Sequence, residues 1–161
     1  MPVLFLSCGG GIEPPAPEIG ITGFSGKITF VGTWPAGIKR THLVVFKNPI
    51  NTPNDFFPPN LSIIIDSVAY GSTTFTYNSA DDNFISNSPV EPGDYAYVVV
   101  AQSKTPDLSL LREDWTVAGI YYANNDYSKP GVLRIEKDKM TKDVNITCDF
   151  DNPPPQPPGG K

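Results

Sequence analysis

Few residues in this sequence are suited to acid–base or nucleophilic chemistry. The chain has one histidine, His42, and two cysteines, Cys8 and Cys148. A single histidine excludes a histidine-rich metal site, and the two cysteines lack the spacing of a zinc site. No Gly-x-Ser-x-Gly elbow offers a serine for His42 to activate. Because His42 begins an apolar run, we expect it to be structural or exposed. We expect a protein that is not an enzyme and needs no cofactor.

Acidic and amide side chains gather in clusters that resemble turns. The clusters lie at 81–83, 124–126 and 149–151. Calcium prefers oxygen ligands from loops, which makes Asp81, Asp82 and Asp126 weak candidate ligands. None of the clusters has the spacing of an EF-hand loop, and turn formation by Asp and Asn explains all of them without a metal. No feature selects a pair of carboxylates for glycoside hydrolysis.

Aromatic side chains are the second group able to recognise a ligand. Trp34, in a Pro-Gly turn, and Tyr127, in a polar loop, are placed to be exposed. Exposed rings of this kind can stack on sugars, with nearby Asn and Asp side chains as hydrogen-bond partners. Trp115 and one of Tyr121 and Tyr122 are expected in the core, because aromatic residues dominate sandwich interiors. Trp34 and Tyr127 are therefore candidate ligand-binding residues, with a glycan as the ligand.

The balance of charge limits the partners. The chain has 17 Asp and Glu against 12 Lys and Arg, a net charge of −5. An acidic surface repels phosphate backbones and offers no polybasic patch to anionic lipids. We therefore expect no nucleic-acid partner.

The elements that must position these residues are short strands. The clearest runs from 144 to 150, where Val144, Ile146, Cys148 and Phe150 share one face, so Cys148 is expected in the core. The run at 95–101 is apolar on both faces and predicts the centre of a sheet. Further strands are predicted at 26–32, 41–47, 61–65, 73–77, 115–122 and 132–136.

The first residues resemble the end of a bacterial lipoprotein signal peptide. The run Leu-Phe-Leu-Ser-Cys ends at Cys8, and Gly9 to Gly11 with nearby prolines make a flexible tether. The resemblance implies that Cys8 is the lipid anchor of an extracytoplasmic protein, in the outer membrane or at the cell surface. The apolar run is shorter than the roughly 7–15 residues of a signal, and no basic residue precedes it, so we expect a truncated signal.

Seven or eight short strands without a convincing helix predict an all-β, two-sheet antiparallel β-sandwich, with a closed barrel as the alternative. Segment 48–60 contains four prolines and predicts a long loop. Segment 108–114 predicts one helical turn. The expected organisation is a truncated signal and tether at 1–18, the sandwich at 19–151, and a disordered Pro/Gly-rich tail at 152–161.

The order of these strands resembles the transthyretin-like, carboxypeptidase-regulatory-type sandwich modules, which are Ig-like in architecture. The likeness is carried by Gly-Lys-Ile-Thr-Phe at 26–30, Pro-Gly-Asp-Tyr-Ala-Tyr at 92–97 and Val-Asn-Ile-Thr-Cys-Asp-Phe at 144–150. It implies a cell-envelope setting and no catalytic residues. The expected function is binding or scaffolding by a lipid-anchored module, whose partners are the membrane, through its anchor, and either a glycan or another envelope protein. A carbohydrate-binding module that uses exposed aromatic residues is the alternative.

Overall fold

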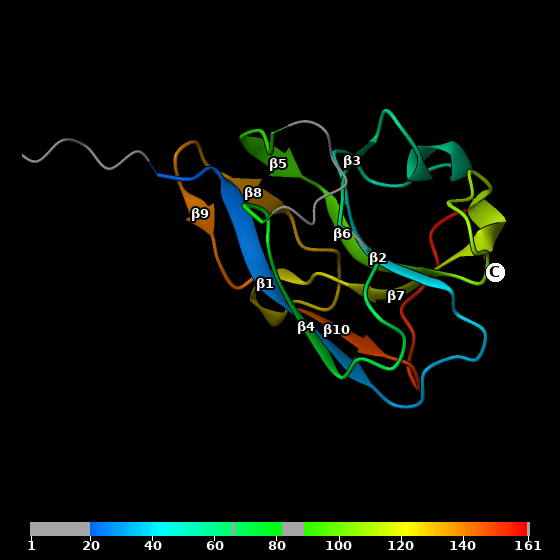
Figure 1. The fold of residues 1–161 in the computed structure, drawn as a ribbon. Helices are drawn as coiled ribbons and strands as arrows, with labels where there is room; N and C mark the ends of the chain where they lie inside the picture. The colour runs from blue at the N-terminus through cyan, green and yellow to red at the C-terminus, as the bar shows by residue number, and fades with distance from the viewer. Residues whose placement is uncertain (1–19, 66, 82–88, 161) are drawn as a thin grey trace, which may run out of the picture.

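The computed structural model describes residues 20–65, 67–81 and 89–160, and its regular elements there are strands and three short helical turns (Figure 1). In chain order the elements are β1 (Gly23–Val31), β2 (Arg40–Phe46), η1 (Pro53–Phe56), β3 (Leu61–Ile64), β4 (Thr74–Asn78), β5 (Gly93–Tyr95), β6 (Tyr97–Ser103), η2 (Arg112–Asp114), β7 (Trp115–Ile120), η3 (Ala123–Asn125), β8 (Leu133–Ile135), β9 (Met140–Thr141) and β10 (Ile146–Asp149). The three η elements are short 3-10 turns. The predicted all-β class is therefore confirmed.

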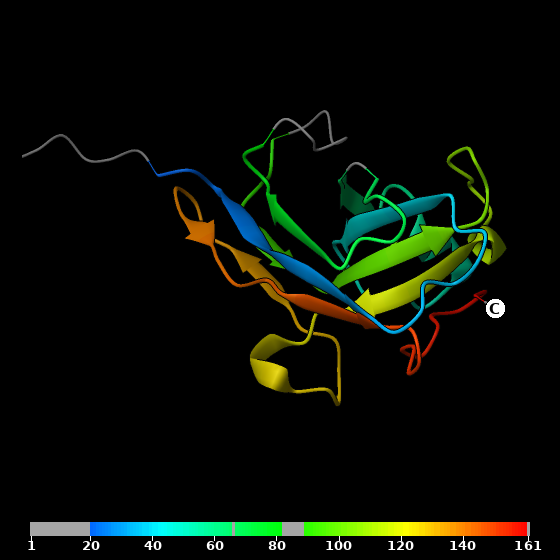
Figure 2. The ribbon, with the colours of Figure 1, turned by 60° about the horizontal axis from the view of Figure 1, so that its bottom comes forward.

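Two four-stranded sheets face each other across the core, and they do not close into a barrel (Figure 2). The first sheet has the order β10-β1-β4, with β9 also pairing β1, and the second has the order β3-β2-β6-β7. A small sheet of β5 and β8 stands beside them. One detail differs from an antiparallel sandwich: β1 runs parallel to both β10 and β9. Long connections over the sandwich make this parallel pairing accessible, whereas hairpins would not.

The main core lies between the two sheets. Ile28 of β1, Val100 of β6 and Cys148 of β10 are all fully buried there. The alternation predicted for the last strand is confirmed, because Val144, Ile146 and Cys148 are buried while Thr147 is exposed. A one-residue slip of this strand would exchange the two sets, so the register is set by its apolar face.

The outer face of the second sheet is also apolar. Val99 and Val117 point away from the main core and join a second buried cluster with Phe46 and Phe56. Segment 48–60 covers part of this face. Its η1 turn brings in Phe56, and the Asn60 carboxamide binds the main-chain atoms of Asn48 at both 2.8 and 3.1 Å. The run apolar on both faces at 95–101 thus reflects two clusters, one on each side of β6.

The segment at 95–101 is interrupted, which the sequence did not predict. Tyr95 ends β5 and pairs with Leu133 of β8, whereas Tyr97 begins β6 and pairs with Phe46 of β2. In one regular strand these two tyrosines would share a face. The break at Ala96 instead leaves Tyr95 in the main core and turns Tyr97 to the outer cluster.

The Pro-Gly turn before β5 is held by its tyrosine. The Tyr95 hydroxyl donates a hydrogen bond to the carbonyl of Glu91 at 2.9 Å, and Gly93 takes a φ of 148°. A positive φ of this size favours glycine, which explains its place in the turn.

The C-terminal segment 152–160 differs from the disordered tail expected from its composition. It runs from β10 past β7 toward η2 (Figure 1). The Gln156 side chain binds the main chain of Val117, and Arg112 donates to the carbonyl of Pro157. A proline-rich composition removes backbone donors, but side-chain hydrogen bonds still hold the segment against the sheet.

Candidate functional site

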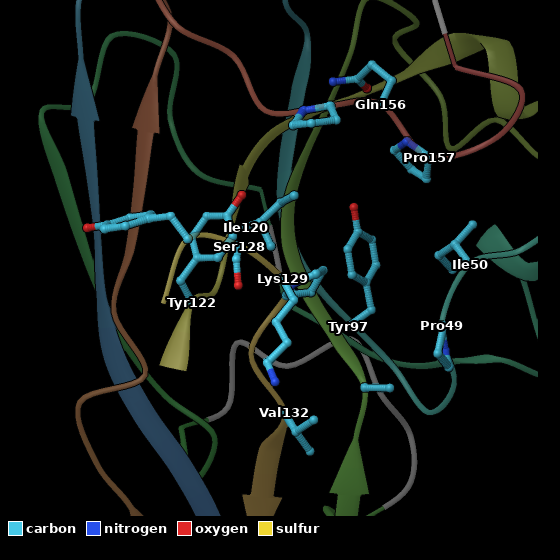
Figure 3. A pocket seen from close by; sticks show the side chains of 14 residues that line it. Pro49, Ile50, Tyr97, Ile120, Tyr122, Ser128, Lys129, Val132, Gln156 and Pro157 are labelled. Atoms are coloured by element: carbon cyan, nitrogen blue, oxygen red, sulfur yellow. The ribbon is translucent and has the colours of Figure 1, made fainter. Parts of the chain in front are cut away.

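The outer face of the second sheet carries a cavity with a volume of about 520 Å³ (Figure 3). Its walls come from the start of β6, the end of β7 with the loop that follows it, the start of segment 48–60 and the C-terminal segment. The side chains that carry its chemistry are Tyr97, Tyr122, Tyr127, Lys129 and Gln156. A volume in the range of about 300–1,000 Å³ is usual for small-molecule sites.

Tyr97 is placed at the cavity by the interruption between β5 and β6 at Ala96. Its ring is 6% exposed and packs on Phe46, with 5.9 Å between the ring centroids. Burial raises the pKa of Tyr97 to about 12, and the nearby Tyr122 adds to the rise. The hydroxyl points toward the segment of Gln156 in Figure 3. It makes no hydrogen bond to another described residue, so it is a neutral donor available to a ligand.

Tyr122 and Tyr127 form an aromatic pair in the loop between β7 and β8. Their ring centroids are 5.1 Å apart at an interplanar angle of 54°, and Tyr127 is 73% exposed. Asn124 and Asn125 both take positive φ angles, which reverse the chain between the two rings. The loop closes where the Gly131 amide donates to the carbonyl of Tyr121 at 2.7 Å. Tyr127, predicted to be exposed, is therefore exposed beside a second tyrosine.

The cavity holds few ionisable groups among the described residues. Among the described residues that line it, Lys129 is the only charged side chain and no carboxylate is present. General acid–base catalysis needs groups that exchange protons near neutral pH. The raised pKa of Tyr97 takes its hydroxyl away from that range, because burial disfavours the phenolate. The cavity offers ring faces and hydrogen-bond donors to a ligand.

Trp34 lies elsewhere, in a separate aromatic cluster that shares no residue with the cavity lining. It is half-buried rather than exposed, and its ring lies 4.7 Å from Phe30, 5.2 Å from Phe150 and 5.2 Å from Tyr70. Its Nε1 donates to the carbonyl of Ser72 at 3.0 Å. These contacts occupy the ring, so Trp34 and Tyr127 do not form one platform.

Two of the three calcium candidates, Asp81 and Asp126, lie among the described residues, and both take part in turns. The Asp126 carboxylate accepts hydrogen bonds from the amide and hydroxyl of Ser128, and the hydroxyl bond is the main cause that lowers its pKa. Asp81 lies in a turn closed by its amide on the carbonyl of Asn78. Asp82 lies outside the described residues. In the described ranges, no three His, Cys, Asp or Glu side chains gather closely enough to hold a metal ion.

The remaining reactive side chains have structural surroundings. His42 is fully buried in β2, and its Nδ1 donates to the carbonyl of Ile65 at 2.8 Å. Burial raises the pKa of the Cys148 thiol to about 12, which keeps it protonated and unreactive. Cys8 lies outside the described residues, so its predicted role as lipid anchor stays a prediction. No helix of the described chain has the length and apolar character to cross a membrane.

No protein-family model, curated protein or solved structure matches this chain. The likeness to transthyretin-like modules therefore stays a resemblance of short motifs. The geometry of the cavity is the basis for a functional proposal.

Proposed function

We propose that this protein is a non-catalytic β-sandwich module that binds a glycan in its tyrosine-lined cavity. The observation that carries the proposal is the convergence of Tyr97, Tyr122 and Tyr127 on one open cavity without a carboxylate. A tyrosine presents an apolar ring and a polar tip, which suits the apolar face and the hydroxyl groups of a sugar. Lys129 and Gln156 add donors at the rim.

The tyrosines differ in burial, and we therefore assign them different roles in glycan binding. Tyr127 is mostly exposed and is backed by Tyr122, so this pair offers a ring for stacking. Tyr97 is buried up to its hydroxyl and is held by Phe46, so it offers a fixed donor at the floor. Rigid aromatic contacts of this kind lose little conformational entropy when a ligand binds.

A glycan array with purified protein tests the proposal. We expect retention of at least one glycan class, and at least a tenfold loss of affinity in Tyr122→Ala and in Tyr127→Ala, about 1.4 kcal/mol each. Tyr70→Ala is the matched control, because Tyr70 is also an exposed tyrosine (57%) but belongs to the Trp34 cluster. An array without retention, or equal loss in Tyr70→Ala, would overturn the proposal.

The proposed setting is the cell envelope, with the chain anchored through a lipid on Cys8. The support is the run of small and apolar residues before Cys8 and the Gly/Pro tether behind it. Labelled palmitate should enter the wild-type chain and the Cys148→Ala variant, since Cys148 is buried, but not Cys8→Ala. Incorporation that survives Cys8→Ala would contradict the anchor. Another envelope protein remains the alternative partner.

A further inference from the structure

The C-terminal segment 152–160 packs against the second sheet and is held there by side-chain hydrogen bonds. Its sequence at 153–158 is Pro-Pro-Pro-Gln-Pro-Pro. Five of these six residues lack an amide hydrogen, so the segment cannot extend the sheet as a regular strand. Its attachment rests on the Gln156 side chain, the carbonyl of Pro157 and half-buried proline rings.

Gln156 recognises the free edge of β7. The Val117 amide donates to Gln156 Oε1 at 2.8 Å, and Gln156 Nε2 donates to the Val117 carbonyl at 2.8 Å. One carboxamide thus satisfies both main-chain groups that β7 presents on its edge at this position. An edge strand with unsatisfied groups of this kind is a template for pairing with another chain.

Arg112 recognises the next residue of the segment. Its side chain is 5% exposed, its guanidinium lies 4.3 Å above the ring of Phe56, and its Nη2 donates to the Pro157 carbonyl at 3.1 Å. Among the described residues its Nε has no hydrogen-bond partner, and neither of the two ion pairs there involves Arg112. Release of the segment would leave a largely buried cation with a further donor unsatisfied, which is unfavourable.

Beyond Gln156 the surface is lined by proline and aromatic side chains. The cavity wall holds Pro155 and Pro157 of the segment, and across it lie Tyr97, Tyr122 and Pro130. Grooves lined by aromatic residues are the usual receptors for polyproline II segments, which are already extended before they bind. The edge of β7, Arg112 and the tyrosines therefore form a continuous surface, which we call the edge site.

We propose that the edge site is a docking site for proline-rich peptides that carry Pro-Gln-Pro, and that it accepts such a peptide from another polypeptide when the chain's own segment is released. Glutamine supplies a donor and an acceptor to Val117, and the following carbonyl accepts from Arg112. The proposal does not rest on the glycan, because its hydrogen bonds are made to the main chain of β7 and to Arg112, but the edge site shares Tyr97 and Tyr122 with the glycan cavity.

The test uses the full chain and a fluorescent synthetic peptide of residues 151–161, with fluorescence anisotropy as the readout. In wild type the chain's own segment competes at an effective concentration on the order of millimolar. Gln156→Ala weakens this competitor while leaving Val117 and Arg112 intact. We expect the peptide to bind Gln156→Ala at least tenfold more tightly than wild type. Gln156→Glu, which cannot donate to the Val117 carbonyl, should behave in the same way.

A second peptide, with alanine in place of its glutamine, is the control for specificity. It should bind neither chain, and its use does not depend on the folding of any further variant. Equal binding of both peptides would overturn the proposal. So would an absence of peptide binding to Gln156→Ala and Gln156→Glu when both chains unfold cooperatively. A negative glycan array together with peptide binding would overturn only the proposed function.

Discussion

A methyl group at Gly119 has no room, because β7 and β10 come together at this residue. An ideal Cβ at Gly119 would lie 2.7 Å from Cys148 Sγ, 2.9 Å from Ile146 Cγ2 and 2.9 Å from the Thr147 carbonyl oxygen. Ordinary contacts between such atoms are about 3.5–4.0 Å. Gly119→Ala should therefore force the edges of the two sheets apart.

The expected loss of stability depends on whether the atoms near Gly119 can move away. The Thr147 oxygen belongs to the main chain of β10, and Ile146 and Cys148 are almost fully buried, so none of the three can turn away into solvent. Overpacking of a dense core costs about 1–3 kcal/mol. For a chain of this size that corresponds to a fall in melting temperature of about 2–4 °C per kcal/mol.

A double-mutant cycle measures this effect. Wild type, Gly119→Ala, Cys148→Ala and the double variant are each unfolded in urea. Cys148→Ala removes Sγ, the nearest of the three obstacles, so Gly119→Ala should cost less in that background by at least about 0.5 kcal/mol. A part of the cost should persist, since Ile146 and Thr147 are unchanged. Strict additivity, or a Gly119→Ala variant as stable as wild type, would refute the close approach of β7 and β10.

Further predictions concern the last strand and the C-terminal segment. Cys148→Asp places an unpaired charge in the core and should cost several kcal/mol, about 3–5, whereas Asn145→Asp on the exposed face should stay within about 0.5 kcal/mol; denaturant midpoints compare the two. The pKa of Cys148 is raised from 9.0 to about 12 by burial. Unfolded chains therefore release a proton that the folded chain keeps, so stability should fall as pH rises from 9 toward 12, by up to about 1.4 kcal/mol per pH unit. Cys148→Ala should show a shallower fall in unfolding free energy over that range. Gln156→Ala should cost about 1–2 kcal/mol and speed hydrogen exchange of the Val117 amide, and an unchanged exchange rate would contradict the contact.

Patterns local to one strand predicted much of the fold. The alternation around Cys148 placed that residue in the core because one side of β10 faces the main core and the other faces solvent. The residues of β6, apolar on both faces, indicated a central strand, and β6 does lie between β2 and β7. Such patterns report burial directly, since the side chains of a strand alternate between faces.

Features that depend on distant partners were not predictable. The parallel pairing of β1 with β10 joins Ile28 to Ile146 across most of the chain, and no local pattern records it. Trp34 occupies a turn that favours exposure, but Phe150 and Tyr70, which are distant in sequence, pack against its ring. The composition of segment 152–160 predicted disorder because its contacts, from Gln156 to Val117 and from Arg112 to Pro157, join residues far apart in the sequence.

The candidate site was predicted only in part. Exposure of Tyr127 followed from its polar loop, but Tyr97 lies in the run 95–101, which was predicted as one continuous strand. The break at Ala96, which turns Tyr97 outward, arises because β5 pairs with β8 while β6 pairs with β2.

The most direct test of the central claim is an NMR titration of the labelled protein with the glycan that the array retains. We expect amide shifts to concentrate at the cavity, on Tyr97, Tyr122, Tyr127, Lys129 and Gln156. Shifts that concentrate instead around Trp34, or that leave the cavity unchanged at saturation, would contradict it.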